Sequence, residues 1–290
     1  MQIESSPLIT IIVPVYNRAK IVTRTINSVI KQTYKNIELI VVNDGSTDNL
    51  MEELNIYNDL NIRVYSFQHN KGVSAARNHG LLNSNGDAIL FLDSDDEIYP
   101  NYIYHMSKEL FGRNNDIVIC RAEYDNNVIL PEISQLDKFF SANSKIDFLL
   151  KGNIFPLSCI LFSNNIKENI YFDTKMKSYE DFDFLLHVMK KFNHMSFLDE
   201  VLVKINDSQN SVNKNISAVL DALLIIKNKF VNELSLNRVT DFYFKKNMIS
   251  ICRNKISIFK KFVLTIDLLT HKEFLNYTHN FLLNFIRGKK

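Results

Sequence analysis

The chain has 290 residues, of which 46% are hydrophobic and 23% are charged, and its formal net charge is +2. This composition is typical of a globular protein with a core of ordinary size, and it argues against a disordered chain. Three widely separated cysteines without a C-x-x-C pair argue against a disulfide framework or a cysteine zinc site, and favour buried thiols in a reducing cytosol.

The first half of the sequence alternates short apolar runs with segments of helical spacing. No basic leader and no apolar run of about 20 residues occurs, so we expect neither a signal peptide nor a membrane span. The alternation predicts an α/β fold with a mostly parallel sheet that is flanked by helices. Expected strands cover 8–15, 37–42, 63–67 and 88–92, and expected helices cover 18–32, 47–57 and 73–83.

Polar groups follow three of these four expected strands. Residues 14–17 read Pro-Val-Tyr-Asn, residues 43–46 read Asn-Asp-Gly-Ser, and residues 93–96 read Asp-Ser-Asp-Asp. In open parallel sheets, ligands bind beyond the carboxyl ends of the strands. We therefore expect a pocket at that edge that combines an aromatic ring, a carboxylate and a dense acidic group.

The acidic group at 93–96 is the most informative of the three. Three carboxylates within four residues repel one another in a pocket unless a cation is present. A hard divalent ion such as Mg²⁺ or Mn²⁺ prefers oxygen ligands and often binds one or two carboxylates together with phosphate oxygens. The alternative is a solvated turn at a helix start, since Asp and Ser are good caps. The position directly after an apolar strand favours the metal.

Two expected helices begin with charged residues. Lys71 and Arg77 lie near the start of the helix at 73–83, where cations and backbone N–H groups could hold a phosphate. Glu180 and Asp181 lie near the start of a helix expected at 178–192, with Ser178 as its N-cap. An ionised carboxylate there could act as a general base. The alternatives are solvated basic side chains in the first case and simple complementation of the helix dipole in the second.

Together these segments resemble glycosyltransferase family 2, whose members have the GT-A fold. Order and spacing agree from residue 8 to about residue 200, whereas the chain beyond about residue 203 matches no family that we can name. The matching pieces include Val-Pro-Val-Tyr-Asn at 13–17, Val-Asn-Asp-Gly-Ser-Thr-Asp at 42–48, Phe-Leu-Asp-Ser-Asp-Asp at 91–96 and Glu-Asp-Phe-Asp at 180–183.

The resemblance implies a donor-binding set. Within it Tyr16 and Pro14 would line the base pocket, and Asp44 would bond a uracil-type ring. One departure is Asn43, which stands where the family pattern has a first Asp and leaves one carboxylate at that corner. The whole implied set is Pro14, Tyr16, Asn17, Asp44, Lys71, Gly72, Arg77, Asp93, Ser94 and Asp95.

The resemblance also implies the catalytic groups. Asp93 and Asp95 form the D-x-D pair, with Asp95 as the more direct ligand of Mn²⁺ or Mg²⁺. Asp181 is the catalytic base, and Glu180 is the second candidate. The expected reaction transfers a sugar, with inversion, from a nucleotide-diphosphate donor, specifically a UDP-sugar, to a hydroxyl of a glycan or lipid-linked acceptor. The expected setting is bacterial surface polysaccharide biosynthesis.

Two other functions compete with this one. A nucleotidyltransferase of related fold would need a glycine-rich phosphate loop after the first strand, and residues 14–19 contain no glycine. An inactive module that only binds a sugar nucleotide would not need Asp93, Asp95 and Asp181, which are all present.

The C-terminal part differs in charge from the rest. Residues 245–290 contain ten Lys or Arg and two Asp or Glu, a local charge of +8, whereas residues 1–244 carry −6. We expect a catalytic domain at 1–205, with a donor half at 1–98 and an acceptor half at 99–205, and a helical extension at 206–290. The extension either packs on the domain or binds an anionic membrane surface, which would make a cytoplasmic protein peripheral to the membrane. It contains no recognised nucleic-acid motif, so we do not expect nucleic acid as a partner.

Overall fold

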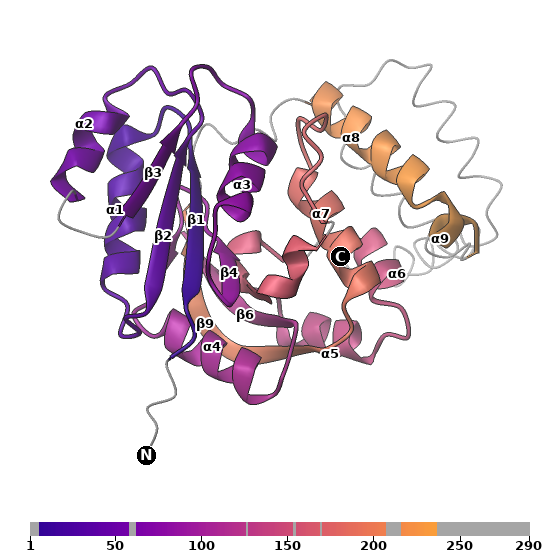
Figure 1. Cartoon of the computed structure of the whole chain (residues 1–290). Coiled ribbons are helices and arrows are strands. Elements are labelled where there is room, and N and C mark those ends of the chain that lie inside the picture. The colour runs from indigo at the N-terminus through magenta and orange to yellow at the C-terminus, as the bar shows by residue number, and fades with distance from the viewer. Residues whose placement is uncertain are drawn as a thin grey trace, which may run out of the picture. The chain divides into compact units, whose positions relative to one another are not determined.

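A computed structural model describes residues 6–57, 62–125, 127–152, 155–168, 170–206 and 216–236. The chain forms two compact units, one of Met1–Lys138 with Ile154–Ser211 and one of Phe139–Asn153 with Val212–Lys290. Over the described residues the first unit is built on one nine-stranded sheet with helices on its faces (Figure 1). The α/β class expected from the sequence is therefore confirmed, while the expected domain limits stay a prediction.

The parallel half of the sheet contains the four strands that the sequence predicted. They are ordered β3-β2-β1-β4, and every residue of β1 is buried. Figure 1 shows α1 and α2 on one side of these strands and α3 on the other, which explains why β1, β2 and β4 are mostly buried and apolar, whereas no residue of the edge strand β3 is buried. The bounds are β1 Ile9–Val15, α1 Ala19–Ile30, β2 Ile37–Asn43, α2 Leu50–Leu54 with a 3₁₀ turn at Asn55–Tyr57, β3 Ile62–Ser66, α3 Val73–Leu82 and β4 Ala88–Phe91.

The other half of the sheet is mixed, which the sequence did not predict. β8 pairs antiparallel with both β4 and β6, β9 pairs parallel with β6, and β5 pairs antiparallel with β9. Several of these strands have only two to four residues, too few to show a period in the sequence. The elements are β5 Glu97–Ile98, α4 Tyr102–Gly112, β6 Ile117–Tyr124, β7 Ile129–Leu130, 3₁₀ turns at Leu157–Cys159 and Asn164–Lys167, β8 Ile160–Ser163, α7 Glu180–Lys191 and β9 Met195–Ile205.

The start of α7 differs from expectation. Tyr179, with φ of 57°, is the N-cap and no side chain caps the helix, so the expected cap at Ser178 is wrong. Tyr179 adopts a left-handed conformation directly before Glu180, so the helix begins at residue 180 and not at the expected residue 178. Asp181 is consequently the second helical residue and lies within the first turn.

An aromatic core packs under α7. The rings of Phe172 and Phe184 are stacked with centroids 4.0 Å apart, and Phe91 of β4 contacts both edge to face. The side chain of Asn78 donates to the carbonyl of Phe172 and accepts from its N–H, both at 2.8 Å, which ties this segment to α3.

Two of the three cysteines, Cys120 and Cys159, are buried as expected. The third, Cys252, lies outside the described residues. The reading of buried thiols is therefore confirmed for the two that the structure describes.

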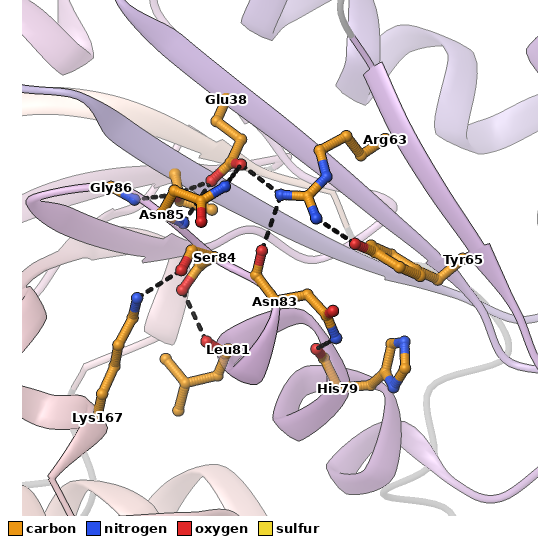
Figure 2. A network of polar contacts seen from close by, with 11 residues as sticks. Glu38, Arg63, Tyr65, His79, Leu81, Asn83, Ser84, Asn85, Gly86 and Lys167 are labelled. Atoms are coloured by element: carbon orange, nitrogen blue, oxygen red, sulfur yellow. Dashed lines mark hydrogen bonds and ion pairs between the residues drawn. The ribbon is translucent and has the colours of Figure 1, made fainter.

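The amino ends of the parallel strands carry a separate polar network (Figure 2). The carboxylate of Glu38 accepts hydrogen bonds from Thr10 at 2.6 Å, from Arg63 at 2.6 Å, and from the N–H and side-chain amide of Asn85 at 2.8 and 2.7 Å. Burial alone would raise the pKa of Glu38, but these donors together lower it. Lys167 closes the network by donating to the carbonyl of Ser84 at 2.6 Å. These hydrogen bonds hold the amino ends of the parallel strands together.

The second unit is helical over its described residues. α5, Ile133–Ser141, runs into this unit, which continues with α6 Lys145–Leu150, α8 Ile216–Lys229 and α9 Val231–Leu236. No helix in the described part of the chain is both long and apolar enough to cross a bilayer. Residues 245–290, which we expected either to pack on the domain or to bind an anionic membrane surface, lie outside the described residues.

Candidate active site

The loops after β1 and β2 are bonded to each other at the carboxyl edge of the parallel strands. Asn17, with φ of 51°, donates its N–H to the hydroxyl of Ser46 at 3.0 Å, and its side-chain oxygen accepts from the N–H of Thr47 at 2.8 Å. Tyr16 is 45% exposed, whereas Pro14 is buried within β1. The structure thus brings the predicted residues 14–17 and 43–47 together.

The loop before α3 is fixed by the carboxylate of Asp44. One oxygen of Asp44 accepts from the N–H of Lys71 at 2.7 Å and the other from the N–H of Gly72 at 2.9 Å. Burial raises the pKa of Asp44, although these two N–H groups oppose the rise. Gly72 has φ of +92°, a conformation that favours glycine, and α3 begins at the next residue. Asp44 therefore connects the end of β2 to the start of α3.

Arg77 of α3 lies between two carboxylates. Its guanidinium is 2.7 Å from Asp93 and 3.0 Å from Glu180, and its side chain is only 5% exposed. Asp93 follows β4, and Glu180 opens α7, so one buried cation joins three elements of the site. The sequence suggested a phosphate-binding cation at this position, and the structure shows that its guanidinium pairs with two of the predicted carboxylates.

A second arginine pairs with the acidic turn. Arg18 lies 2.7 Å from the carboxylate of Asp95 and donates to the hydroxyl of Ser94 at 3.3 Å. The backbone carbonyl of Asp95 accepts from Arg24 at 3.1 Å and from the side chain of Asn206 at 2.8 Å. The turn is therefore held from both its side chains and its backbone.

Ser158 ties the two ends of this turn together. Its buried hydroxyl donates to Asp96 at 2.7 Å and accepts from the N–H of Asp93 at 3.4 Å. Burial raises the pKa of Asp96 well above its usual range, and the nearby charge of Asp93 adds to the rise. Asp96, directly after Asp95, is thus held in place by the hydroxyl of Ser158.

Asp181 has the acidity that a general base needs. Burial and, to a smaller extent, the neighbouring charge of Glu180 raise its pKa, Arg77 opposes them, and the net result is a pKa of about 6. Its carboxylate also accepts a hydrogen bond from the N–H of Phe182 at 2.7 Å. At neutral pH such a group is ionised and can still accept a proton.

The comparison with family models identifies the chain. The model for glycosyl transferase family 2 matches residues 10–165, more than half of the sequence. The chain belongs to glycosyltransferase family 2. Among its relatives is an uncharacterized glycosyltransferase from Haemophilus influenzae, which is 36% identical over 190 residues, 64% of this chain and 73% of the relative. Glycosyltransferase GlyA of Streptococcus pneumoniae is 45% identical over 112 residues, but these cover 38% of this chain and only 16% of GlyA.

Solved structures of similar fold include two glycosyltransferases. Residues 1–349 of S. aureus TarS, in complex with UDP-GlcNAc, give a TM-score of 0.66 at 22% identity, over 88% of this chain and 77% of that one. The mannosyltransferase PcManGT from Pyrobaculum calidifontis, in complex with GDP-Man and Mn²⁺, gives 0.62 at 15% identity, over 95% and 84%. These likenesses confirm the GT-A fold class for this family 2 chain.

Sequence reasoning missed several residues that build the site. Arg18 directly follows the polar cluster at 14–17, and this position could have suggested a role in the site. Its partner, Asp95, lies 77 positions away in the sequence. Asn78 directly follows the predicted Arg77, but nothing in the sequence indicates its contact with Phe172. Ser158 and Asn206 come from a weakly patterned region and gave no signal.

Proposed function

We propose that this family 2 chain is an inverting glycosyltransferase that moves a sugar from a UDP-sugar to a hydroxyl of a glycan or lipid-linked acceptor. The observation that carries the proposal is the position of Arg77, which bridges Asp93 at the donor edge to Glu180, next to Asp181. The donor cluster and an ionisable base are thereby held at one edge of the sheet. The complex of TarS with UDP-GlcNAc supports a UDP-sugar donor.

The loops at this edge suit a nucleotide. In the proposal the exposed ring of Tyr16 stacks on the base, with Pro14 and Asn17 shaping the loop beneath it. Asp44 orients the Lys71-Gly72 turn through two backbone N–H groups and contacts the base through its remaining lone pairs. Ser94 belongs to the same donor-binding set through the acidic turn.

The charges of the site fit a divalent cation. Four carboxyl groups, those of Asp93, Asp95, Glu180 and Asp181, belong to this site, and Arg18 and Arg77 form the ion pairs with three of them, so the carboxyl groups outnumber these two arginines. In the described residues no three acidic, histidine or cysteine side chains converge as a metal site made of protein alone would require. An ion that takes one or two carboxylates and completes its shell with phosphate oxygens suits this arrangement.

Asp95 and Asp93 are the residues that would hold Mn²⁺ or Mg²⁺. Such an ion would supply charge stabilisation for the leaving diphosphate. The complex of PcManGT with Mn²⁺ supports the assignment for this fold. The donor set consists of carboxylate oxygens only, as hard cations prefer.

The proposed reaction is a single displacement. Asp181 removes the proton from the acceptor hydroxyl, the acceptor oxygen bonds to the anomeric carbon, and the bond from that carbon to the diphosphate breaks. Arg77 stabilises the charge that develops on the leaving group, and the sugar passes through an oxocarbenium-like state. Attack from the opposite face converts an α-linked donor into a β-linked product.

A screen of nucleotide sugars tests the proposal directly. Purified protein is incubated with UDP-glucose, UDP-galactose, UDP-GlcNAc and GDP-mannose, each with Mn²⁺, Mg²⁺ or chelator, and release of the nucleotide is measured. We expect metal-dependent release or a thermal shift with at least one UDP-sugar. If all donors fail in both assays, the proposed activity is wrong, and a response to GDP-mannose alone would replace the UDP assignment.

The setting of the reaction is a further part of the proposal. An acceptor on a bacterial surface polysaccharide or lipid precursor would place the enzyme at the inner face of the membrane, and residues 245–290 with their charge of +8 would bind anionic lipid there. Sedimentation with liposomes of rising anionic content tests this. Binding should weaken with salt and vanish when the residues after 245 are removed; intact protein that stays in solution at low salt would assign the segment to another role.

A further inference from the structure

The carboxylate that we assign to the metal already has a cationic partner. Arg18 lies 2.7 Å from Asp95, and the two side chains are 23% and 12% exposed. Solvent and salt screen such a pair less than a pair on the open surface. A divalent cation at Asp95 therefore approaches a carboxylate whose charge Arg18 has neutralised, and the two cations repel each other.

The backbone of the acidic turn is held in place around Asp95. Its backbone carbonyl accepts from Arg24 at 3.1 Å and from Asn206 at 2.8 Å. The next residue, Asp96, accepts from the buried Ser158 at 2.7 Å. Ser158 also accepts from the N–H of Asp93, so Arg24, Asn206 and Ser158 together hold the backbone of the turn. The short side chain of Asp95 can then only rotate in place, whereas the long side chain of Arg18 can carry its guanidinium away from the turn.

The position of Arg18 indicates where it would go. It follows residues 14–17, which we assign to the donor pocket, and it directly precedes α1. A guanidinium binds phosphate oxygens with two parallel hydrogen bonds, so a nucleotide diphosphate in that pocket offers Arg18 an alternative to Asp95.

We propose that Arg18 couples the binding of the divalent cation to the binding of the nucleotide diphosphate. Without nucleotide, Arg18 competes with the cation for Asp95, and with nucleotide it transfers to the diphosphate and leaves Asp95 to the cation. This inference rests on the proposed function and adds to it a coupling between the cation and the nucleotide. Thermodynamic linkage requires that the cation tighten nucleotide binding by the same factor.

Titrations of Mn²⁺ with and without UDP test the coupling. Free Mn²⁺ is measured by electron paramagnetic resonance in the intact protein and in the Arg18→Gln and Arg24→Gln variants. In the unchanged protein we expect UDP to tighten Mn²⁺ binding about tenfold or more, a usual range for coupled sites. In Arg18→Gln, Mn²⁺ alone should bind more tightly than in the unchanged protein, and the effect of UDP should shrink.

Arg24→Gln is the matched control, because Arg24 carries the same charge as Arg18 and contacts the same acidic turn. Arg24 contacts Asp95 only through the backbone carbonyl, so its loss should leave the coupling intact. Arg18→Met, which keeps the apolar stem, replaces Arg18→Gln if that variant melts early. An equal gain in Mn²⁺ affinity in Arg24→Gln, or unchanged coupling in a folded Arg18 variant, overturns the inference. Absence of Mn²⁺ binding to the unchanged protein even with UDP would instead refute the metal in the proposed function.

Discussion

Arg77 and Glu180 form an ion pair of 3.0 Å although they are 103 positions apart in the sequence. The pair joins α3, which lies on the donor side, to the first turn of α7. Asp181 follows Glu180 directly and responds to both charges, since Glu180 raises its pKa and Arg77 lowers it. Burial raises the pKa of the candidate base most, and the contact that joins α3 to α7 adjusts this pKa through its two charges.

The first prediction concerns this acidity. A carboxylate with pKa of about 6 is protonated below pH 6, and only its ionised form accepts a proton, so kcat/KM should fall as the pH drops through 6. Glu180→Gln removes the charge that raises the pKa of Asp181, so the acid limb of the pH profile should move to lower pH. A profile measured from pH 4.5 to 8 checks this, and a limb that stays in place or moves upward contradicts it.

The second prediction tests Asp181 as the base. Asp181→Asn should lower kcat by roughly 10²–10⁴-fold, the usual worth of general base catalysis. The dissociation constant of UDP should hardly change, because Asp181 faces the acceptor in the proposed reaction. Single-turnover rates and UDP titrations separate the two quantities. A loss of UDP affinity in step with the rate would make Asp181 a donor-binding or structural residue.

The third prediction concerns the metal. Asp95→Asn should abolish sugar transfer and leave the fold intact, because it removes one charge from a crowded acidic turn whose backbone contacts remain. Activity and circular dichroism are measured together. Asp221→Asn, an exposed change on α8, serves as the control and should keep full activity. Full activity of Asp95→Asn in the presence of chelator would exclude the assignment.

The carboxyl edge was predictable because a polar cluster marks the end of three of the four parallel strands in the sequence. Polar residues follow β1, β2 and β4 directly, and parallel pairing alone brings them to one edge. The contacts that hold the edge were not predictable. Ser158 comes from a 3₁₀ turn before a four-residue strand, and Tyr179 adopts a left-handed conformation that no local residue type signals. Such positions depend on tertiary packing, which a single sequence does not display.

The fourth prediction concerns the turn after β2. Gly45 has φ of +71°, and a Cβ there would lie 2.4 Å from the backbone carbon of His69. Gly45→Ala should therefore lower the free energy of unfolding by more than about 1–2 kcal/mol, the cost of the left-handed conformation alone. Gly112→Ala is the control, because a Cβ there meets nothing within 4 Å, and it should be neutral or slightly stabilising. Urea denaturation gives the free energy of unfolding of both variants. Equal changes in the two variants would show that the turn at Gly45 can accommodate a Cβ.

The last prediction concerns Glu38 at the opposite edge of the sheet. Glu38→Gln keeps the shape of the side chain but places an amide group among Arg63, Thr10 and the N–H of Asn85, which all donate to the carboxylate. Loss of charge-assisted bonds at this buried site should lower the free energy of unfolding by about 1–3 kcal/mol at pH 7. Glu52→Gln, an exposed change on α2, should have almost no effect.

The pH dependence of this difference follows from the pKa of Glu38. Burial favours the protonated form, but the hydrogen-bond donors outweigh it and the folded-state pKa is lowered. Its contribution is therefore present above the unfolded-state pKa of about 4.3 and is lost as the pH falls, when Glu38 takes up a proton and comes to resemble Gln. The gap between the unchanged protein and Glu38→Gln should stay constant down to about pH 5 and narrow from there to about pH 3 in urea denaturation. A gap that is constant over this range would mean that packing, and not the ionised carboxylate, accounts for the loss.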